Sequence, residues 1–81
     1  MITVGEAISL KNMYIDIVCT EGRVVQVNEK ELKLQIRIDN NTYEVDFVTL
    51  VDIVLDEKQR EYLLETTEEI REEMRIENRG W

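Results

Sequence analysis

Carboxylates are the side chains of this sequence whose number and spacing could do chemistry. Histidine is absent, and the chain holds one serine, Ser9, and one cysteine, Cys19. A serine or cysteine nucleophile needs a neighbouring base, and no histidine can serve as one, so we expect Cys19 to be a structural thiol. No calcium-binding loop of the D-x-D-x-D-G type occurs, and a Cys/His metal site lacks its ligands. The sequence predicts a protein that is not an enzyme and uses no cofactor or metal.

The carboxylates are densest in the last third of the chain. Residues 56–81 contain nine acidic and five basic side chains. At 100° per residue on a helix, five glutamates fall within a wedge of about 80°, here termed the glutamate row: Glu57, Glu61, Glu65, Glu68 and Glu72. Their spacing along the axis is about 4.5 to 6 Å, and like charges so placed destabilise a helix by about a few tenths of a kcal/mol per pair. The row indicates either a solvated helix face or a surface for a positively charged partner.

Length and charge limit the kinds of partner. Eighty-one residues suit a single domain, with a sheet core at 1–55 and an acidic helix at 56–81, and a domain this small gains from oligomerisation. The 18 acidic and 10 basic side chains give a net charge of -8, which attracts basic proteins and repels nucleic acid and anionic membranes. Neither a long apolar run nor a basic leader occurs, so we expect an unprocessed cytoplasmic protein.

The residue pattern predicts an α+β fold. Thr3 and Glu6 fit a capping box that would open a short helix through about Leu10. The apolar segment 48–55 is either a fifth strand or the lead-in to the long helix, and we favour the strand. A period of two before it predicts four antiparallel strands, at 15–17, 25–27, 32–38 and 42–48. The expected architecture is a four- to five-stranded meander or small barrel with a short N-terminal helix and a long acidic C-terminal helix.

Loop lengths predict the register of the sheet. A three-residue loop at 20–22, a four-residue loop at 28–31 and a two-residue loop at 40–41 connect the strands. These loops pair Ile17 with Val25, Val27 with Leu32, Ile36 with Val45, and Arg37 with Glu44. One face of the sheet then collects six apolar side chains that we expect to be buried together: Val25, Val27, Leu34, Ile36, Val45 and Phe47.

The long helix has predicted ends and one thin apolar stripe. Asp56 fits an N-cap, with Gln59 three residues later, and Gly80 fits a stop after about Asn78. The stripe is too narrow for a complete core and too apolar to be wholly solvated, so we expect a homodimer in which it contacts the mate. This predicted dimer seam consists of Leu63, Ile70 and Met74.

The segment from Gly22 to Asn28, GRVVQVN, followed by Leu32, resembles the first half of the Sm motif. With a short helix before antiparallel strands, about half of the chain is similar to Sm-like and SH3-like small barrels. The resemblance implies a small β barrel. Asn28 stands where the Sm family has an aspartate, and the second-half glycine motif that helps to bind uridine is absent, so RNA binding is not carried over.

The chain has a second resemblance, which lies in its charge and size. As a class, the chain resembles phage-encoded acidic proteins of host takeover, which mimic DNA and occupy the DNA-binding face of a basic host protein. The nucleoid protein HU is one known target of that class. The resemblance implies an inhibitor that binds a basic DNA-binding protein and not nucleic acid or membrane. The carboxylates that would contact the partner are the glutamate row together with Glu69, Glu73, Glu44 and Asp46.

The sequence is also compatible with a function of another class. The chain could be a small-barrel assembly module that self-associates through a sheet edge and the predicted dimer seam. Duplex DNA carries two charged strands, so a mimic needs a second line of carboxylates beside the glutamate row. An assembly module would instead place its charges at the rim of an apolar interface. The sheet-edge residues that could supply a second line are Glu29, Glu31, Asp39, Glu44 and Asp46.

Overall fold

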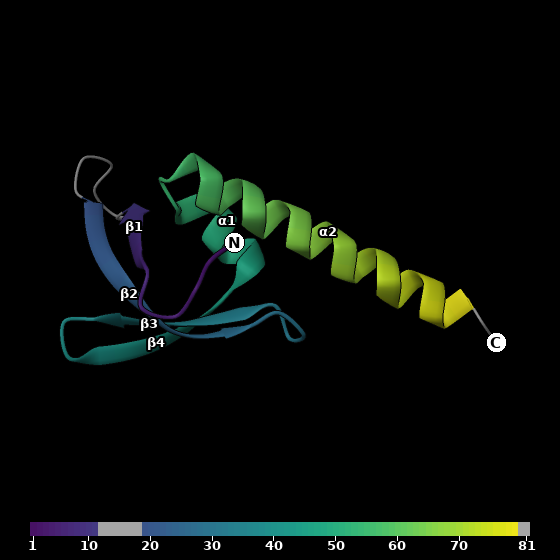
Figure 1. Ribbon diagram of the computed structural model, residues 1–81, viewed down its shortest axis with the longest axis horizontal. Helices are drawn as coiled ribbons and strands as arrows, with labels where there is room; N and C mark the ends of the chain where they lie inside the picture. Colours follow the sequence, from purple (N-terminus) through teal and green to yellow (C-terminus); the bar gives the residue numbers. More distant parts are fainter. Residues whose placement is uncertain (12–18, 80–81) are drawn as a thin grey trace.

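Four antiparallel strands in chain order form an open sheet, and two helices cover one of its faces (Figure 1). The computed structural model describes residues 1–11 and 19–79. The α+β class and the meander are confirmed, whereas the closed barrel is wrong because the sheet is open. The predicted strand at 15–17 and the stop at Gly80 lie outside the described residues. The elements are β1 Ala7–Lys11, β2 Cys19–Asn28, β3 Lys33–Ile38, β4 Asn41–Asp46, α1 Phe47–Ile53 and α2 Glu57–Arg79.

The predicted N-terminal helix is wrong, because the chain turns once and then enters β1. The Thr3 N–H donates to the Glu6 carboxylate at 3.4 Å, which is half of the expected capping box. Gly5 between them has a φ of +90°, a left-handed conformation that a helix does not contain. Ile8 and Leu10 then alternate with exposed neighbours and enter the core from β1. The alternation of exposed and buried residues over these five positions is typical of a strand, and the segment forms one.

Gly22 lies inside β2 and not in a loop, so the predicted loop at 20–22 is wrong. Its Cα partner is Ile8 on β1. Gly22 is buried, and a Cβ at this position would clash with Cγ2 of Ile36 on β3. The glycine therefore serves close packing between strands, which a sequence pattern does not distinguish from a turn.

A β-bulge in β2 sets which valines reach the core. Val24 pairs with Ile36, whereas Val27 pairs with Leu34, so Val25 is an extra residue between two registers. Val24 is buried and Val27 is half-buried, but Val25 is 39% exposed. The prediction that Val25 and Val27 share the core face is therefore wrong for Val25. Leu34 and Ile36 are buried as predicted.

The bulge and the next turn also change the predicted pairings. The β2–β3 connection is residues 29–32, with Leu32 at a φ of 58°, so Val27 does not pair with Leu32. The β3–β4 turn is residues 39–40, with Asp39 at a φ of 56°. The observed β3–β4 pairing differs from the predicted pairing by two residues, so each side chain stays on its predicted face of the sheet. The observed partners are Leu34 with Val45, Gln35 with Glu44, Ile36 with Tyr43, and Arg37 with Thr42.

The predicted fifth strand is wrong, because α1 occupies its place. Phe47 begins this helix, and its side chain is fully buried as predicted. Phe47, Leu50 and Val54 are spaced i, i+3, i+7 and all face the core, a spacing that suits a helix. The end of the segment still pairs with β1. Val54 forms an isolated bridge with Leu10, and the Leu55 N–H donates to the Ser9 carbonyl at 3.0 Å.

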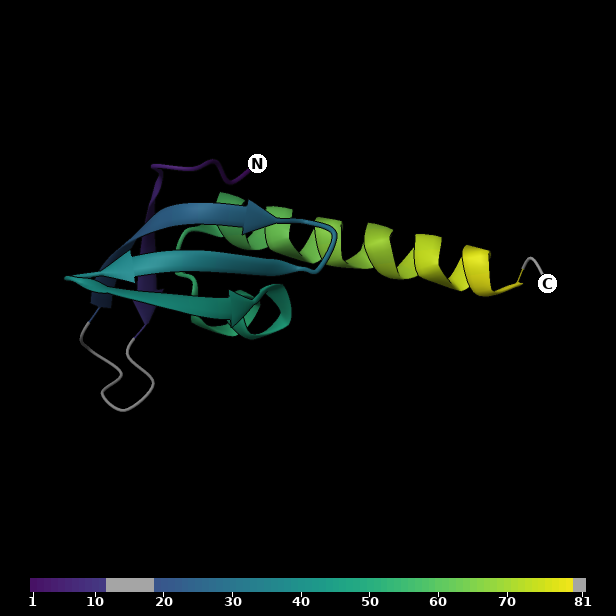
Figure 2. The same ribbon diagram turned by 90° about the horizontal axis from the view of Figure 1, so that it is seen from below.

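The start of α2 is confirmed at Asp56. Its Oδ1 accepts hydrogen bonds from the Lys58 and Gln59 N–H groups at 2.9 and 3.0 Å. The buried Gln59 side chain donates to the Ala7 carbonyl at 3.0 Å, which ties α2 to β1. Beyond this contact α2 extends well past the sheet, as Figures 1 and 2 show, in a molecule of 48 × 23 × 20 Å. The core consists of Ile2, Ile8, Leu10, Val24, Leu34, Ile36, Phe47, Leu50, Val54 and Leu63.

Candidate functional site

The glutamate row lies on α2, on the side away from the core. All five of its side chains are exposed. The buried residues of α2 are Gln59, Leu63, Thr66 and Thr67. At 100° per residue they lie about 180° around the helix from the row. From Glu57 to Glu72 the row spans about 22 Å at 1.5 Å per residue. The packing of α2 therefore presents the row to solvent as one continuous line.

Few cations neutralise the row. Within the described residues its one ion pair joins Glu72 Oε2 to Arg75 Nη1 at 3.8 Å. Both side chains are mostly exposed, and such pairs contribute little to stability. Arg60 does not reach the row, because its guanidinium donates to the Val54 carbonyl at the end of α1. Most of the carboxylates in the row are thus available to a partner.

The other predicted partner-binding carboxylates divide between two faces. Glu69 and Glu73 are exposed on α2 beside the row. Glu44 and Asp46 are exposed on the outer face of β4, and Glu44 lies 3.6 Å from Lys33 Nζ. The outer face of the sheet and the outer face of α2 point away from a shared core, so these two residues face the opposite side of the molecule. Glu69 and Glu73 are brought to the row, and Glu44 and Asp46 are not.

The predicted dimer seam is only partly at the surface. Leu63 is fully buried in the chain's own core, which leaves Ile70 and Met74 as the residues of the seam that a mate could contact. Ile70 is half-buried and Met74 is 53% exposed. The last two continue the core-facing stripe toward the C-terminal end of α2.

A groove between α1 and α2 was not predicted from the sequence. It encloses about 250 Å³ and is lined by Val48, Val51, Asp52, Leu64, Thr67, Glu68 and Arg71. Val48 is 49% and Leu64 46% exposed, so the apolar part of the groove is open to solvent. The apolar segment 48–55, interpreted as a fifth strand, concealed this groove, since a helix turns Val48 and Val51 toward one side.

Tyr62 links α2 to the β2–β3 connection. Its hydroxyl donates a hydrogen bond to the Glu29 carboxylate. Burial, followed by this hydrogen bond and the negative charge of Glu29, raises the pKa of Tyr62 from 10.0 to about 12. The ring of Tyr62 also packs against Phe47, with centroids 6.4 Å apart. Glu29, although exposed, thus also helps to hold α2 against the sheet.

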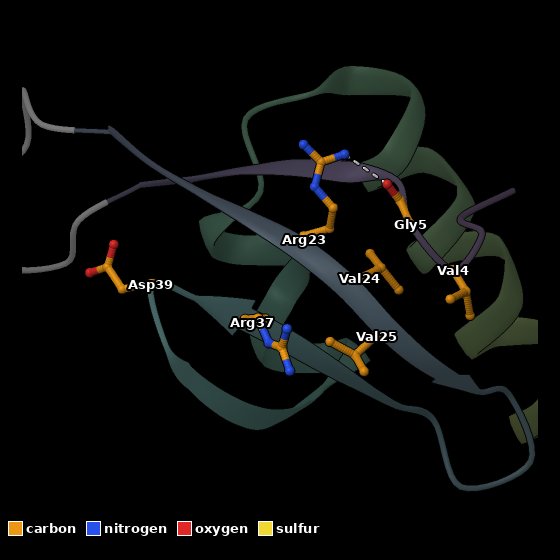
Figure 3. Close-up of a pocket in the computed structure, with 7 residues that line it drawn as sticks. All are labelled: Val4, Gly5, Arg23, Val24, Val25, Arg37 and Asp39. Atoms are coloured by element: carbon orange, nitrogen blue, oxygen red, sulfur yellow. Dashed lines mark hydrogen bonds between the residues drawn. The ribbon is translucent and has the colours of Figure 1, made fainter.

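The outer face of the sheet carries a basic pocket that the predicted register concealed. Arg23 on β2 and Arg37 on β3 are direct Cα partners. The pocket, shown in Figure 3, has a volume of about 550 Å³ and is lined by Val4, Gly5, Arg23, Val24, Val25, Arg37 and Asp39. The predicted pairing placed Arg23 opposite an apolar residue, so only the observed bulge brings the two arginines together.

The described ranges contain no group of three or more His, Cys, Asp or Glu side chains that could hold a metal ion. Of the helices in those ranges, neither is long and apolar enough to cross a membrane. No family model, curated protein or solved structure matches this chain. Its function is therefore inferred from its surfaces.

Proposed function

We propose that the chain is a non-enzymatic acidic binding protein that occupies the DNA-binding face of a basic protein. The acidic helix α2 would supply the contact surface, and an HU-like nucleoid protein is the candidate partner. The observation that supports this proposal is the glutamate row, exposed on a helix that extends past the sheet. A row of like charges costs helix stability, so a cationic partner would stabilise it.

The row would imitate part of the charge of one DNA strand. DNA has one phosphate per ~3.4 Å along each strand, and the row places a carboxylate about every 6 Å, with Glu69 and Glu73 beside it. Glu44 and Asp46 face the other side of the molecule and do not supply the second strand. A second copy of α2 would supply that strand, so the proposal is linked to the predicted homodimer. Binding through exposed charges would be fast and sensitive to salt.

A gel shift with HU and a short DNA duplex tests the proposal. Wild-type protein should displace DNA from HU, and Glu61→Lys/Glu65→Lys/Glu68→Lys should not. The matched control is Glu21→Lys/Glu31→Lys/Glu44→Lys, because it changes the net charge by the same amount at exposed positions off α2. Displacement by the control at the wild-type concentration would locate the contact on α2. Equal displacement by all three proteins, or none by the wild type, would contradict the proposal.

The groove between α1 and α2 favours a second candidate, an assembly module. Val48 and Leu64 are exposed and apolar, and the charged residues Asp52, Glu68 and Arg71 line the same groove. Charges at the rim of an apolar patch are typical of protein interfaces. If this groove mediates self-association, Leu64→Lys should reduce the mass measured by light scattering and leave displacement of DNA from HU unchanged.

A further inference from the structure

Arg23 and Arg37 form an opposed cation pair that the proposed function does not use. Residues directly opposite on antiparallel strands have Cβ atoms about 4.5 to 5.5 Å apart, and like charges at that distance destabilise the sheet. The salt bridges of the described residues, Lys33 with Glu44 and Arg75 with Glu72, involve neither arginine. The chain has a net charge of -8, yet these two cations lie opposed on one open face and neither forms a salt bridge within the described residues.

The N-terminal segment forms one wall of the pocket and holds Arg23 in place. Arg23 Nη1 donates to the Gly5 carbonyl at 2.9 Å, a hydrogen bond visible in Figure 3. The Gly5 N–H in turn donates to the Val24 carbonyl at 2.8 Å, and the Val24 N–H donates to the Glu6 carbonyl at 2.9 Å. These bonds fix the wall against β2. One guanidinium is thus held in place, which lowers the entropy cost of binding an anion.

The geometry points to a binding site for a compact oxyanion, a carboxylate or phosphate group carried on a small apolar body. The free N–H groups of Arg23 and Arg37 supply forked donors that match both kinds of anion. Val4, at 65% exposure, and Val25 lie beside them in the same pocket and supply apolar contact. A volume of about 550 Å³ is in the range of small-molecule sites.

Surrounding carboxylates restrict the ligand to a single anionic group. Asp39 lines the same pocket, at the end away from Val4 in Figure 3. Glu21 lies two residues from Arg23 on the same face of β2, and Glu44 pairs with Gln35, two residues from Arg37. A nucleic acid strand laid along this face would meet these three negative charges. A compact anion would be small enough not to meet all three of them.

Titration of the wild-type protein with inorganic phosphate and with butyrate, at constant ionic strength, tests the site. Proton–nitrogen NMR spectra should show shifts at the Nε–H groups of Arg23 and Arg37 and at the Gly5 and Val25 amides. Inorganic phosphate tests the charge alone, and butyrate adds an apolar chain. Tighter binding of phosphate would assign the site to phosphate-bearing ligands. Tighter binding of butyrate would assign it to carboxylates with an apolar body.

Two charge-preserving variants separate the site from general attraction of anions. Arg23→Lys/Arg37→Lys keeps the net charge but removes the forked donors, and it should weaken binding of the tighter probe by about tenfold or more. Arg71→Lys/Arg75→Lys makes the same change on exposed residues of α2 and should leave binding at the wild-type level. Circular dichroism checks that both variants fold. Absence of shifts at the two arginines, or equal affinity in both variants, would overturn the site.

Discussion

Gly22 is a position in β2 at which the packed core leaves no room for a side chain. The space that its Cβ would need is occupied by Cγ2 of Ile36, with side chains of Ile38 and Leu10 next in distance. Gly22→Ala should therefore lower the free energy of unfolding by about 1 to 3 kcal/mol, because the core must shift to admit one carbon. Urea denaturation measures the change, and Ser9→Ala on the exposed face of β1 is the matched control. Equal stability of Gly22→Ala and wild type would contradict the observed packing.

Phe47 is the largest fully buried side chain of the core. It lies where β4 passes into α1, and its N–H donates to the Leu32 carbonyl at 2.8 Å. Phe47→Ala should cost about 3 to 5 kcal/mol, enough to unfold most of a domain this small. Val48→Ala removes an adjacent side chain that is half exposed, and it should melt close to the wild type. A cooperative, near-native melt of Phe47→Ala would show that this ring is not central to the core.

Tyr62 gives the protein a measurable response to alkaline pH. Its folded-state pKa of about 12 lies above the value of 10.0 for an unperturbed tyrosine, since the fold favours the neutral phenol. The stabilisation from this group is therefore complete below pH 10 and is lost as the pH rises from 10 toward 12. Phenolate absorbance of wild type and Tyr62→Phe should differ by a step near pH 12. Glu29→Gln should move that step to lower pH, and an unchanged step would contradict the Glu29 contact.

At the scale of elements, sequence periodicity predicted β3 and β4 better than it predicted the pairing of the strands. Leu34 and Ile36 alternate strictly, and β3 and its buried face are as expected. The GRVVQVN segment is ambiguous because Val24, Val25 and Val27 are all apolar, so the pattern does not show which valine the bulge leaves out. Segment 48–55 is similarly ambiguous, since a short apolar run fits a strand and a helix equally well. Both errors lie where neighbouring apolar residues allow two periods.

The start of α2 was predictable because the signal is local. Asp56 accepts two backbone hydrogen bonds, and nothing distant is needed to explain them. Asp56→Ala should lower the free energy of unfolding by about 0.5 to 2 kcal/mol by leaving these N–H groups without a protein acceptor. Thermal melts followed by circular dichroism measure the loss. The exposed Asp52 of α1 provides a control, Asp52→Ala, which is expected to change stability less than Asp56→Ala.

At the scale of the whole molecule, charge placement was partly predictable. The glutamate row depends on helical spacing alone, and all five side chains are exposed on α2. The position of Glu44 and Asp46 relative to the row depends on how α2 packs on the sheet, which no local pattern specifies. The Arg23–Arg37 pair required the bulge, so the sequence pattern gave no sign of it. Charge features built on one element could be predicted, and those built on two could not.

The predicted homodimer is a property of the whole molecule, because one α2 supplies only one side of a DNA-like charge pattern. Ile70 and Met74 continue the core-facing stripe toward the C-terminal end of α2, on the side opposite the row, so a mate packed there would carry a second row on the far side of the helix pair. Light scattering at low micromolar concentration should give the dimer mass for wild type and the monomer mass for Met74→Glu. Ile76→Glu makes a matched change about 160° around α2 from Met74 and should stay dimeric. A monomer mass for the wild type would count against this seam and leave a single row of carboxylates to account for any binding to HU.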